Sequence, residues 1–337
     1  MISPAEWLRF YSPSQCRDLV LPEWHVLVGD FHIVRGSTTV IGGPPSVGKS
    51  RAITALARVG ATREEWFGLP VHVQFKTLIL QNENGRHRLK QEFSNVAEDA
   101  LDKFIRISEP PPFGMAFDRP EFRAELERQC NEFCPAVVAV DPWNSVARDD
   151  KQKDYLETFE AIRLALPKGD KVPALVIAAH TKKPQGDVRK TGRSLLHEVA
   201  GSHVLASVPR CVFVMQSVSD DPSDDRIIWT CCKNNDGEMG DPSVWHRRDG
   251  LFVPADMSEA ELQAVANGPK VRPSIEESHL RALFDEGRRT LSKKDAVPEL
   301  MQLSGCGHSA CYEALSSAGK FRHHLRECEN GLLSWQS

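Results

Sequence analysis

The amino-acid sequence predicts an α/β protein whose mostly parallel sheet is flanked by helices, followed by a small C-terminal unit of different character. Three observations predict this fold class. Short apolar runs alternate with helical stretches over the first two thirds of the chain, and a glycine-rich loop directly follows one of these runs. The last 63 residues instead contain helical stretches and then a hairpin signal. Alternating strands and helices are typical of parallel sheets covered on both faces.

The apolar runs are short and rich in Val, Ile, Leu and Ala, as expected for strands buried on both faces of a sheet. We expect them at residues 38–41, 77–80, 104–107, 136–140 and 174–179. The stretches between them have helical periodicity. We expect helices directly after Ser50 and at residues 86–100, 119–133 and 154–166.

The pattern changes after residue 210. Three further apolar runs, at residues 211–215, 227–231 and 244–246, are separated by turns rich in Asp, Ser, Pro, Asn and Gly. Such turns favour hairpins between antiparallel strands. We therefore expect these strands to extend the sheet on one side.

The C-terminal part has the outline of a winged helix-turn-helix. Gly268, Pro269 and Pro273 indicate a linker. Helices are expected at residues 275–286, 293–303 (with Ser292 as N-cap) and 308–318, and a hairpin at 321–335 around Asn330 and Gly331. Three helices followed by a hairpin are typical of this motif. We thus expect an α/β domain at 1–253, a linker at 254–274 and a winged-helix-like domain at 275–337.

Composition limits the classes of protein that the chain can belong to. The formal net charge is −4, so any contact with nucleic acid must come from a local basic patch. Nine cysteines without regular spacing favour reduced thiols over a disulfide framework. We assign Cys130 and Cys134, and the group Cys306, His308 and Cys311, to packing rather than to zinc. The absence of a long apolar run and of a secretory signal predicts a cytoplasmic protein.

The loop Gly42-Gly-Pro-Pro-Ser-Val-Gly-Lys-Ser fits the phosphate-binding pattern G-x-x-x-x-G-K-[ST] between a strand and a helix. Its glycines let backbone N–H groups surround an anion, and the helix N-terminus adds further donors. Lys49 would reach the β- and γ-phosphates, and the Ser50 hydroxyl would bind Mg²⁺. We therefore expect ATP and Mg²⁺ as cofactors, with the nucleotide held by Gly43, Ser46, Val47, Gly48, Lys49, Ser50 and Arg51.

Two carboxylates follow buried strands at the edge where parallel sheets bind ligands. Asp141 ends the run 136–140 and could hold Mg²⁺ through its water shell. Glu83 follows the run 77–80 and could orient the attacking water and accept its proton. The alternative for each is an acidic residue that starts a turn.

A polar strand end and a basic segment come next. His180 ends the run 174–179 and could sense the γ-phosphate by a hydrogen bond. Residues 182–193 carry five basic side chains against the single acid Asp187, a net charge of +4 that suits contact with a phosphate backbone. A solvated surface loop is the alternative. The candidate nucleic-acid contacts are Lys182, Lys183, Arg189, Lys190 and Arg193.

An ordered set of motifs carries a family resemblance. It comprises Gly43–Ser50, Gln81-Asn-Glu-Asn, Val138-Ala-Val-Asp-Pro, Ala179-His-Thr-Lys-Lys and Gly201-Ser-His. The set resembles the RecA-like ATPases of the plasmid RepA type, hexameric replicative helicases akin to the DnaB core, over about residues 20 to 250. Position 46 is Ser, where that family often has Gly or Ala.

The resemblance implies a role for each of these residues. Lys49 and Ser50 would bind phosphate and Mg²⁺, Glu83 would be the catalytic base, Asp141 would support Mg²⁺, and His180 would be the sensor. Arg210 and Lys233 match the late basic positions with which the family reaches a neighbouring subunit's nucleotide. A ring-shaped homo-oligomer, a hexamer in the family, is therefore expected.

Three functions fit these observations. The first is an ATP-driven motor on single-stranded DNA, a replicative helicase of a plasmid, phage or other mobile element. The second is a regulator in which ATP controls binding to DNA or protein. The third and weakest is a small-molecule kinase, which would usually carry an Arg-rich lid. Residues 275–337 hold eight Lys or Arg and nine Asp or Glu, so this domain could bind a replication protein as readily as DNA.

Overall fold

The computed structural model describes residues 10–93, 99–143, 146, 152–169, 172–182, 190–199, 203–219, 221, 223–248, 250–257, 261, 275–285, 289–317, 319–328 and 331–336. The chain divides into two compact units. The first contains Met1–Lys183 and Thr191–Ser258, and the second contains Pro184–Lys190 and Glu259–Ser337. Most of the expected linker, 254–274, lies outside the described residues.

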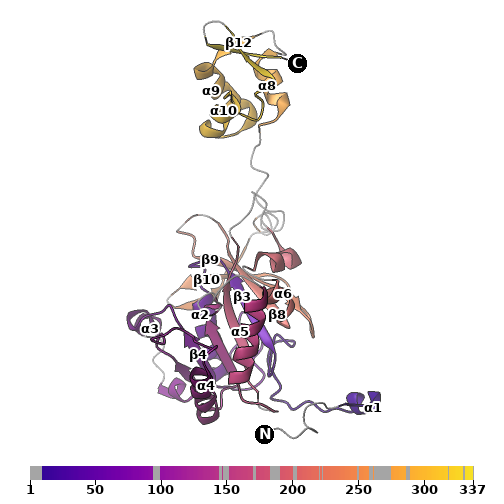
Figure 1. The fold of residues 1–337 in the computed structure, drawn as a ribbon, viewed down its shortest axis with the longest axis vertical. Helices are drawn as coiled ribbons and strands as arrows, with labels where there is room; N and C mark the ends of the chain where they lie inside the picture. Colours follow the sequence, from indigo (N-terminus) through magenta and orange to yellow (C-terminus); the bar gives the residue numbers. More distant parts are fainter. Residues whose placement is uncertain are drawn as a thin grey trace. The chain divides into compact units, whose positions relative to one another are not determined.

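A nine-stranded sheet forms the centre of the first unit, in the order β11-β10-β9-β8-β3-β7-β6-β4-β5 (Figure 1). The pairs from β8 through β5 are parallel, and β8, β9, β10 and β11 pair antiparallel. The strands are β3 (Thr38–Gly43), β4 (Thr77–Gln81), β5 (Ile105–Ile107), β6 (Val137–Asp141), β7 (Ala174–His180), β8 (Cys211–Ser217), β9 (Arg226–Asn234), β10 (Ser243–Arg248) and β11 (Leu251–Pro254).

Helices cover both faces of this sheet. The helical elements are α1 (Pro13–Arg17), α2 (Lys49–Thr62), α3 (Arg86–Phe93), α4 (Pro120–Phe133), α5 (Gln152–Ala165) and α6 (Val204–Ser207), with 3₁₀ helices η2 (Asp99–Lys103) and η4 (Gly192–Glu198). α2 packs on one face together with the small hairpin β1 (Val26–Val28) and β2 (Ile33–Val34). α4, α5 and α6 pack on the other face, with α5 in front of the sheet in Figure 1.

The alternation of side chains along each strand produces the two cores. In β3, Ile41 belongs to the core under α2, and its neighbour Val40 belongs to the core under α5. The same alternation separates Val138 from Ala139 in β6. A strand buried on both faces has no polar side, which explains the continuous apolar runs in the sequence.

The expected α/β fold is confirmed, including the antiparallel extension on one side of a mostly parallel sheet. The boundaries differ by a few residues. Of the helix expected at 86–100, α3 is described over Arg86–Phe93, residues 94–98 lie outside the described residues, and Asp99 begins η2. The sequence did not indicate α1, the β1–β2 hairpin or β11. These helices and strands are two to five residues long, too short for periodicity to reveal them.

The second unit has its own core. Its helices are α8 (Glu277–Leu283), α9 (Lys293–Ser304) and α10 (His308–Ala314). Its antiparallel sheet has the order β12 (Thr290–Ser292), β14 (Leu332–Trp335) and β13 (Leu325–Glu327). Ser292 accepts a hydrogen bond from the Asp295 amide and caps α9, as expected. The strand β12 was not expected, and the winged-helix assignment stays a prediction.

Two further expectations concern cysteines and membranes. Cys130, Cys306 and Cys311 are buried, but Cys134 is exposed at the C-terminus of α4 and does not pack in the core, contrary to expectation. The described part of the chain contains no cluster of His, Cys, Asp or Glu suited to a metal ion. Within that same part, none of the helices is both long and apolar enough to span a bilayer.

Candidate nucleotide site

The loop between β3 and α2 has the conformation that its sequence predicts. Gly48 has φ 111° and Ser46 has φ 63°, both in the left-handed region. A side chain at Gly43 would not fit, because a Cβ there would lie 2.8 Å from Val47 Cγ1 and 3.1 Å from the Met215 carbonyl oxygen. With its positive φ, Ser46 adopts a backbone conformation that is disfavoured for a residue other than glycine. α2 begins at Lys49, so its free N–H groups face the loop.

Lys49 is buried within the loop that it ends, with 7% of its surface exposed. Its Nζ donates hydrogen bonds to the carbonyl oxygens of Gly43 (2.9 Å) and Pro44 (2.8 Å), and lies 3.3 Å from Nδ1 of His180. Burial lowers the pKa of Lys49 to about 8, while the charges of Asp141 and Glu83 oppose that shift. The ammonium group thus contacts neutral partners, with two carboxylates nearby. A phosphate anion in the loop would stabilise its charged form.

His180 ends β7, the strand directly beside β3. Burial, and then the charge of Lys49, lowers the pKa of His180. The imidazole is therefore neutral at pH 7, and Nδ1 can accept a hydrogen bond from Lys49 Nζ. A neutral imidazole at this position can exchange its hydrogen bond when Lys49 moves toward a phosphate.

The two expected carboxylates lie at the ends of the next two strands. Gln81, the last residue of β4, is opposite Asp141, the last residue of β6, and the Asn82 amide donates to the Asp141 carbonyl oxygen at 3.0 Å. Asp141 is 5% exposed, whereas Glu83 is exposed. The order β3-β7-β6-β4 therefore brings Lys49, His180, Asp141 and Glu83 to one edge of the sheet.

Gln81 was not identified from the sequence, although it fixes the turn that carries Glu83. Its Oε1 accepts from the Asn84 amide at 2.7 Å, and its Nε2 donates to the Ser108 carbonyl oxygen at 2.8 Å. The side chain is 1% exposed. A buried polar residue at the end of an apolar run was the available signal, because such a residue must find partners.

These residues fit a Mg²⁺-bound nucleoside triphosphate. The loop has the glycine cradle and the lysine for phosphates, and the half-buried Ser50 and the buried Asp141 supply hard oxygen ligands of the kind that Mg²⁺ prefers. Val47 is buried beneath the loop, and Arg51 is half-buried in the first turn of α2. The ten expected residues at this edge thus include structural members and members that could touch the ligand.

Arg210 and Lys233 lie at the opposite edge of the sheet. The Arg210 amide bonds to the Thr38 carbonyl oxygen, at the amino end of β3, and Lys233 pairs with Val212 near the start of β8. Arg210 forms an ion pair with Asp236, its Nε donating at 2.9 Å. Lys233 donates to the carbonyl oxygens of Ala206 (2.9 Å) and Ser207 (3.0 Å). The structure does not bring either one to the nucleotide site of its own chain.

The expected nucleic-acid contacts are described only in part. Lys182 and Arg193 of the first unit and Lys190 of the second are exposed. Lys183 and Arg189 lie outside the described residues. The role of this basic segment stays a prediction.

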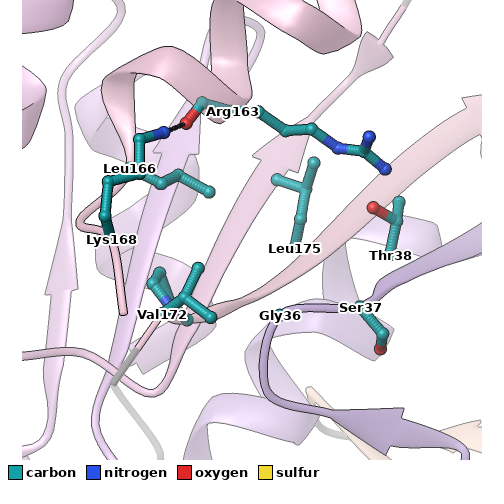
Figure 2. Close-up of a pocket in the computed structure, with 9 residues that line it drawn as sticks. Gly36, Ser37, Thr38, Arg163, Leu166, Lys168, Val172 and Leu175 are labelled. Atoms are coloured by element: carbon teal, nitrogen blue, oxygen red, sulfur yellow. Dashed lines mark hydrogen bonds between the residues drawn. The ribbon is translucent and has the colours of Figure 1, made fainter. Parts of the chain in front are cut away.

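A pocket of about 380 Å³ lies at the same edge as Arg210, away from the phosphate loop. Its walls include Ser37 and Thr38 at the start of β3, Leu175 near the start of β7, and Arg163 and Lys168 at the end of α5 (Figure 2). The Lys168 ammonium donates to the Arg163 carbonyl oxygen. None of the expected nucleotide-binding residues lines it.

Arg247 is the second residue that sequence reasoning missed. It lies on β10, yet its Nη1 donates to the carbonyl oxygens of Ser46 (2.9 Å) and Val47 (3.4 Å) in the phosphate loop. The residues are 201 positions apart in the chain. No local pattern could have indicated this contact.

Comparisons with known proteins agree with this geometry. The family model described as AAA domain (AAA_25) matches residues 14–186, which include the phosphate loop, Glu83, Asp141 and His180. None of the curated proteins matches the chain.

Two solved structures resemble the chain. One is a KaiC-like protein from the hyperthermophilic archaeon Pyrococcus horikoshii OT3 (12% identity, TM-score 0.47, 67% of this chain and 94% of that one). The other is the RadB recombinase (13% identity, TM-score 0.45, 66% of this chain and 93% of that one). Since the family match extends over just over half of the 337 residues, the chain belongs to the AAA domain family.

Proposed function

We propose that this protein hydrolyses ATP with Mg²⁺ and uses the energy to act on single-stranded DNA, as a replicative helicase of a plasmid, phage or other mobile element does. The main support for hydrolysis is that His180, Asp141 and Glu83 all lie near Lys49. Its Nζ lies 3.3 Å from His180 Nδ1, and its pKa responds to the charges of Asp141 and Glu83. One site therefore contains a phosphate ligand, a sensor, a metal-supporting carboxylate and a base.

Each residue has a distinct chemical task in this proposal. Lys49 leaves the carbonyl oxygens of Gly43 and Pro44 and neutralises phosphate charge. Glu83, exposed on its turn, orients the attacking water and accepts its proton. Ser50 and Asp141 hold Mg²⁺, which when bound neutralises charge that develops on the phosphate oxygens. His180 loses its hydrogen bond from Lys49, donates one from a ring N–H to the γ-phosphate and so reports which nucleotide is bound.

The test of the base compares two Glu→Gln variants. Glu83→Gln should bind ATP normally and hydrolyse it roughly 10²–10⁴-fold more slowly, the usual contribution of a positioned general base. Glu109→Gln is the matched control, because Glu109 lies just beyond β5 at the same sheet edge and pairs with Arg86. Its turnover should equal that of the wild type. If Glu83→Gln turns over normally and Asp141→Asn does not, the two roles were assigned the wrong way round.

The action on DNA rests on the net charge of +4 in residues 182–193. We expect single-stranded DNA to stimulate the ATPase rate of the wild type. Changing Lys183, Arg189 and Lys190 together to Gln should weaken DNA binding and flatten its salt dependence, because phosphate contacts release counterions. The basal ATPase rate should persist. Unchanged affinity and salt slope in the triple variant would exclude the segment as the DNA contact.

A regulator without unwinding activity is the second candidate. The C-terminal unit supports it, because its third helix, α10, presents an exposed Tyr312 and Glu313 and has no Lys or Arg. Such a helix is poorly suited to base readout in a major groove and better suited to a protein partner. An ATPase rate that does not change when single-stranded DNA is added would favour this candidate over the motor.

A further inference from the structure

Arg247 connects the antiparallel end of the sheet to the phosphate loop. Its strand, β10, is three places from β3 in the sheet, yet Nη1 donates to the carbonyl oxygens of Ser46 and Val47 at 2.9 and 3.4 Å. The aliphatic part of Arg247 also approaches the loop. A Cβ at Gly48 would lie 3.5 Å from Arg247 Cδ and 3.4 Å from Phe252 Cζ. The side chain therefore contacts Ser46 and Val47 and fills the space beside Gly48, directly before Lys49.

The guanidinium group of Arg247 is itself fixed in place. Its Nε and its backbone amide both donate to the Asp225 carbonyl oxygen at 3.1 Å. The Asp225 carboxylate is held by His246 Nδ1 at 2.6 Å and by Arg248 Nε at 3.1 Å. These contacts lower the pKa of Asp225, with the hydrogen bond from His246 as the largest cause. Asp225 therefore stays ionised and anchors β10 where Arg247 reaches the loop.

The contacted atoms decide what Arg247 can do. In a phosphate loop the N–H groups point inward to the anion, so the carbonyl groups point away from it. Ser46 has φ 63°, a backbone conformation that is unfavourable for every residue except glycine. A charged donor on the Ser46 and Val47 carbonyl oxygens holds those peptide groups, and hence the direction of their N–H groups. Arg247 thus acts on the side of the loop opposite to the ligand.

We propose that Arg247 is a positioning residue for nucleotide binding, which pre-arranges the phosphate loop by holding the carbonyl oxygens of Ser46 and Val47. The inference rests on the proposed ATPase function and deepens it. Because Arg247 acts on the loop before any phosphate arrives, its contribution is the same for ATP, ADP and the transition state. Uniform contributions of this kind change affinity and KM and leave kcat unchanged.

The experiment measures the Kd of ATP and ADP, together with KM, kcat and the Tm of the nucleotide-free protein. Arg247→Ala should raise Kd for both nucleotides, and KM, by about tenfold or more, the usual size of a lost charge-assisted hydrogen bond. kcat should stay within about twofold of the wild type. Arg106→Ala is the matched control, because it removes a guanidinium on β5 from an exposed ion pair with Glu132 and leaves both the loop contacts and Asp225 intact. Its affinities should equal those of the wild type.

The variants separate the possible outcomes. A lower Tm with unchanged Kd and KM would overturn the proposal, because a merely structural role would lower the stability and leave nucleotide binding unchanged. A fall in kcat at unchanged Kd would also overturn it, by assigning Arg247 to the transition state. Arg247→Gln carries the same expectation if Arg247→Ala does not fold. Failure of the wild type to bind ATP would overturn the proposed function and this inference together, whereas normal wild-type binding with unaffected variants overturns only the inference.

Discussion

At the scale of the residue, Lys49 shows how a fold holds a buried ammonium group in a phosphate loop. The side chain is buried, and its Nζ contacts two loop carbonyl oxygens and a neutral imidazole. Burial is the largest cause of its lowered pKa, so the charged form is disfavoured in the fold. A bound phosphate would favour that charged form. Ligand binding and protonation at Lys49 are therefore coupled.

This coupling predicts a pH dependence of nucleotide affinity. With a pKa of about 8 in the nucleotide-free protein, Lys49 is neutral above that pH and must take up a proton to bind phosphate. We expect the affinity for ATP to fall above pH 8, by up to about tenfold per pH unit. Calorimetry at pH 8.5 in buffers of different ionisation enthalpy should detect the proton uptake. Lys49→Met should bind far more weakly and show no such uptake.

The same shift has a defined sign for stability. The unfolded chain holds the Lys49 proton up to the ordinary value of 10.5, whereas the folded chain loses it near 8. Between these values the unfolded state binds more protons, so this group makes the nucleotide-free fold more stable as pH rises. Below pH 8 its cost is present in full. A binding enthalpy for ATP at pH 8.5 that does not change with the ionisation enthalpy of the buffer would contradict the assignment.

At the scale of the element, α2 carries the phosphate loop and must be held firmly against the sheet. Its buried face is built from small residues and branched aliphatics, among them Ala52, Ile53 and Leu56. Gly60 lies on the same face against the ring of Phe75. A Cβ at Gly60 would overlap Cε2 of that ring and lie 2.5 Å from its Cζ. The close approach of helix and ring depends on the missing side chain.

We therefore predict that Gly60→Ala destabilises the protein. Alanine is favoured over glycine within a helix by about 1 kcal/mol, but overpacking at a buried contact costs about 1–3 kcal/mol. Because the collision involves a buried ring, the packing cost should exceed the helical gain. Chemical denaturation of the nucleotide-free protein measures the net change in the free energy of unfolding. Phe75→Leu should relieve the collision, so that the double variant loses less stability than the two single changes added together. Strict additivity would show that α2 shifts instead.

At the scale of the whole molecule, the two edges of the sheet carry different basic residues. Lys49 lies at the edge where the parallel strands end, and Arg210 and Lys233 lie where β3 and β8 begin. A charge at the far edge can complete a nucleotide site only across a subunit boundary. Arg210 is held by an exposed ion pair with Asp236, and exposed pairs contribute little to stability. Arg210 can therefore leave Asp236 at small cost.

This arrangement predicts ATP-dependent assembly with shared sites. Glu83→Gln and Arg210→Ala subunits should each be nearly inactive alone and regain part of the ATPase activity when mixed, because some interfaces then contain both wild-type residues. Arg226→Ala, which breaks an ion pair with Asp224 inside one subunit, is the control and should behave like the wild type. Oligomers that form without recovered activity would exclude Arg210 as the shared residue. Strictly monomeric behaviour with ATP and Mg²⁺ would exclude the assembly.

The sequence by itself determined the fold class and the edge of the sheet at which the candidate site lies. The buried strands could be recognised because both faces of each strand are covered, so that apolar residues run continuously. The phosphate loop could be recognised because its glycines, lysine and serine are local in sequence and each has a fixed task. Placing Glu83, Asp141 and His180 at that same edge required only that parallel strands end together.

Only the tertiary structure decided the contacts that join distant segments. Arg247 reaches Ser46 across 201 residues, through the pairing of four strands and the side-chain contacts of β10. The turn of Glu83 depends on a hydrogen bond from Gln81 to Ser108, and the pKa of Lys49 depends on how deeply the loop is buried. Burial, electrostatic environment and long-range hydrogen bonds are properties of the packed chain. Local spacing cannot encode them, because the same residues in an unpacked chain would be solvated by water.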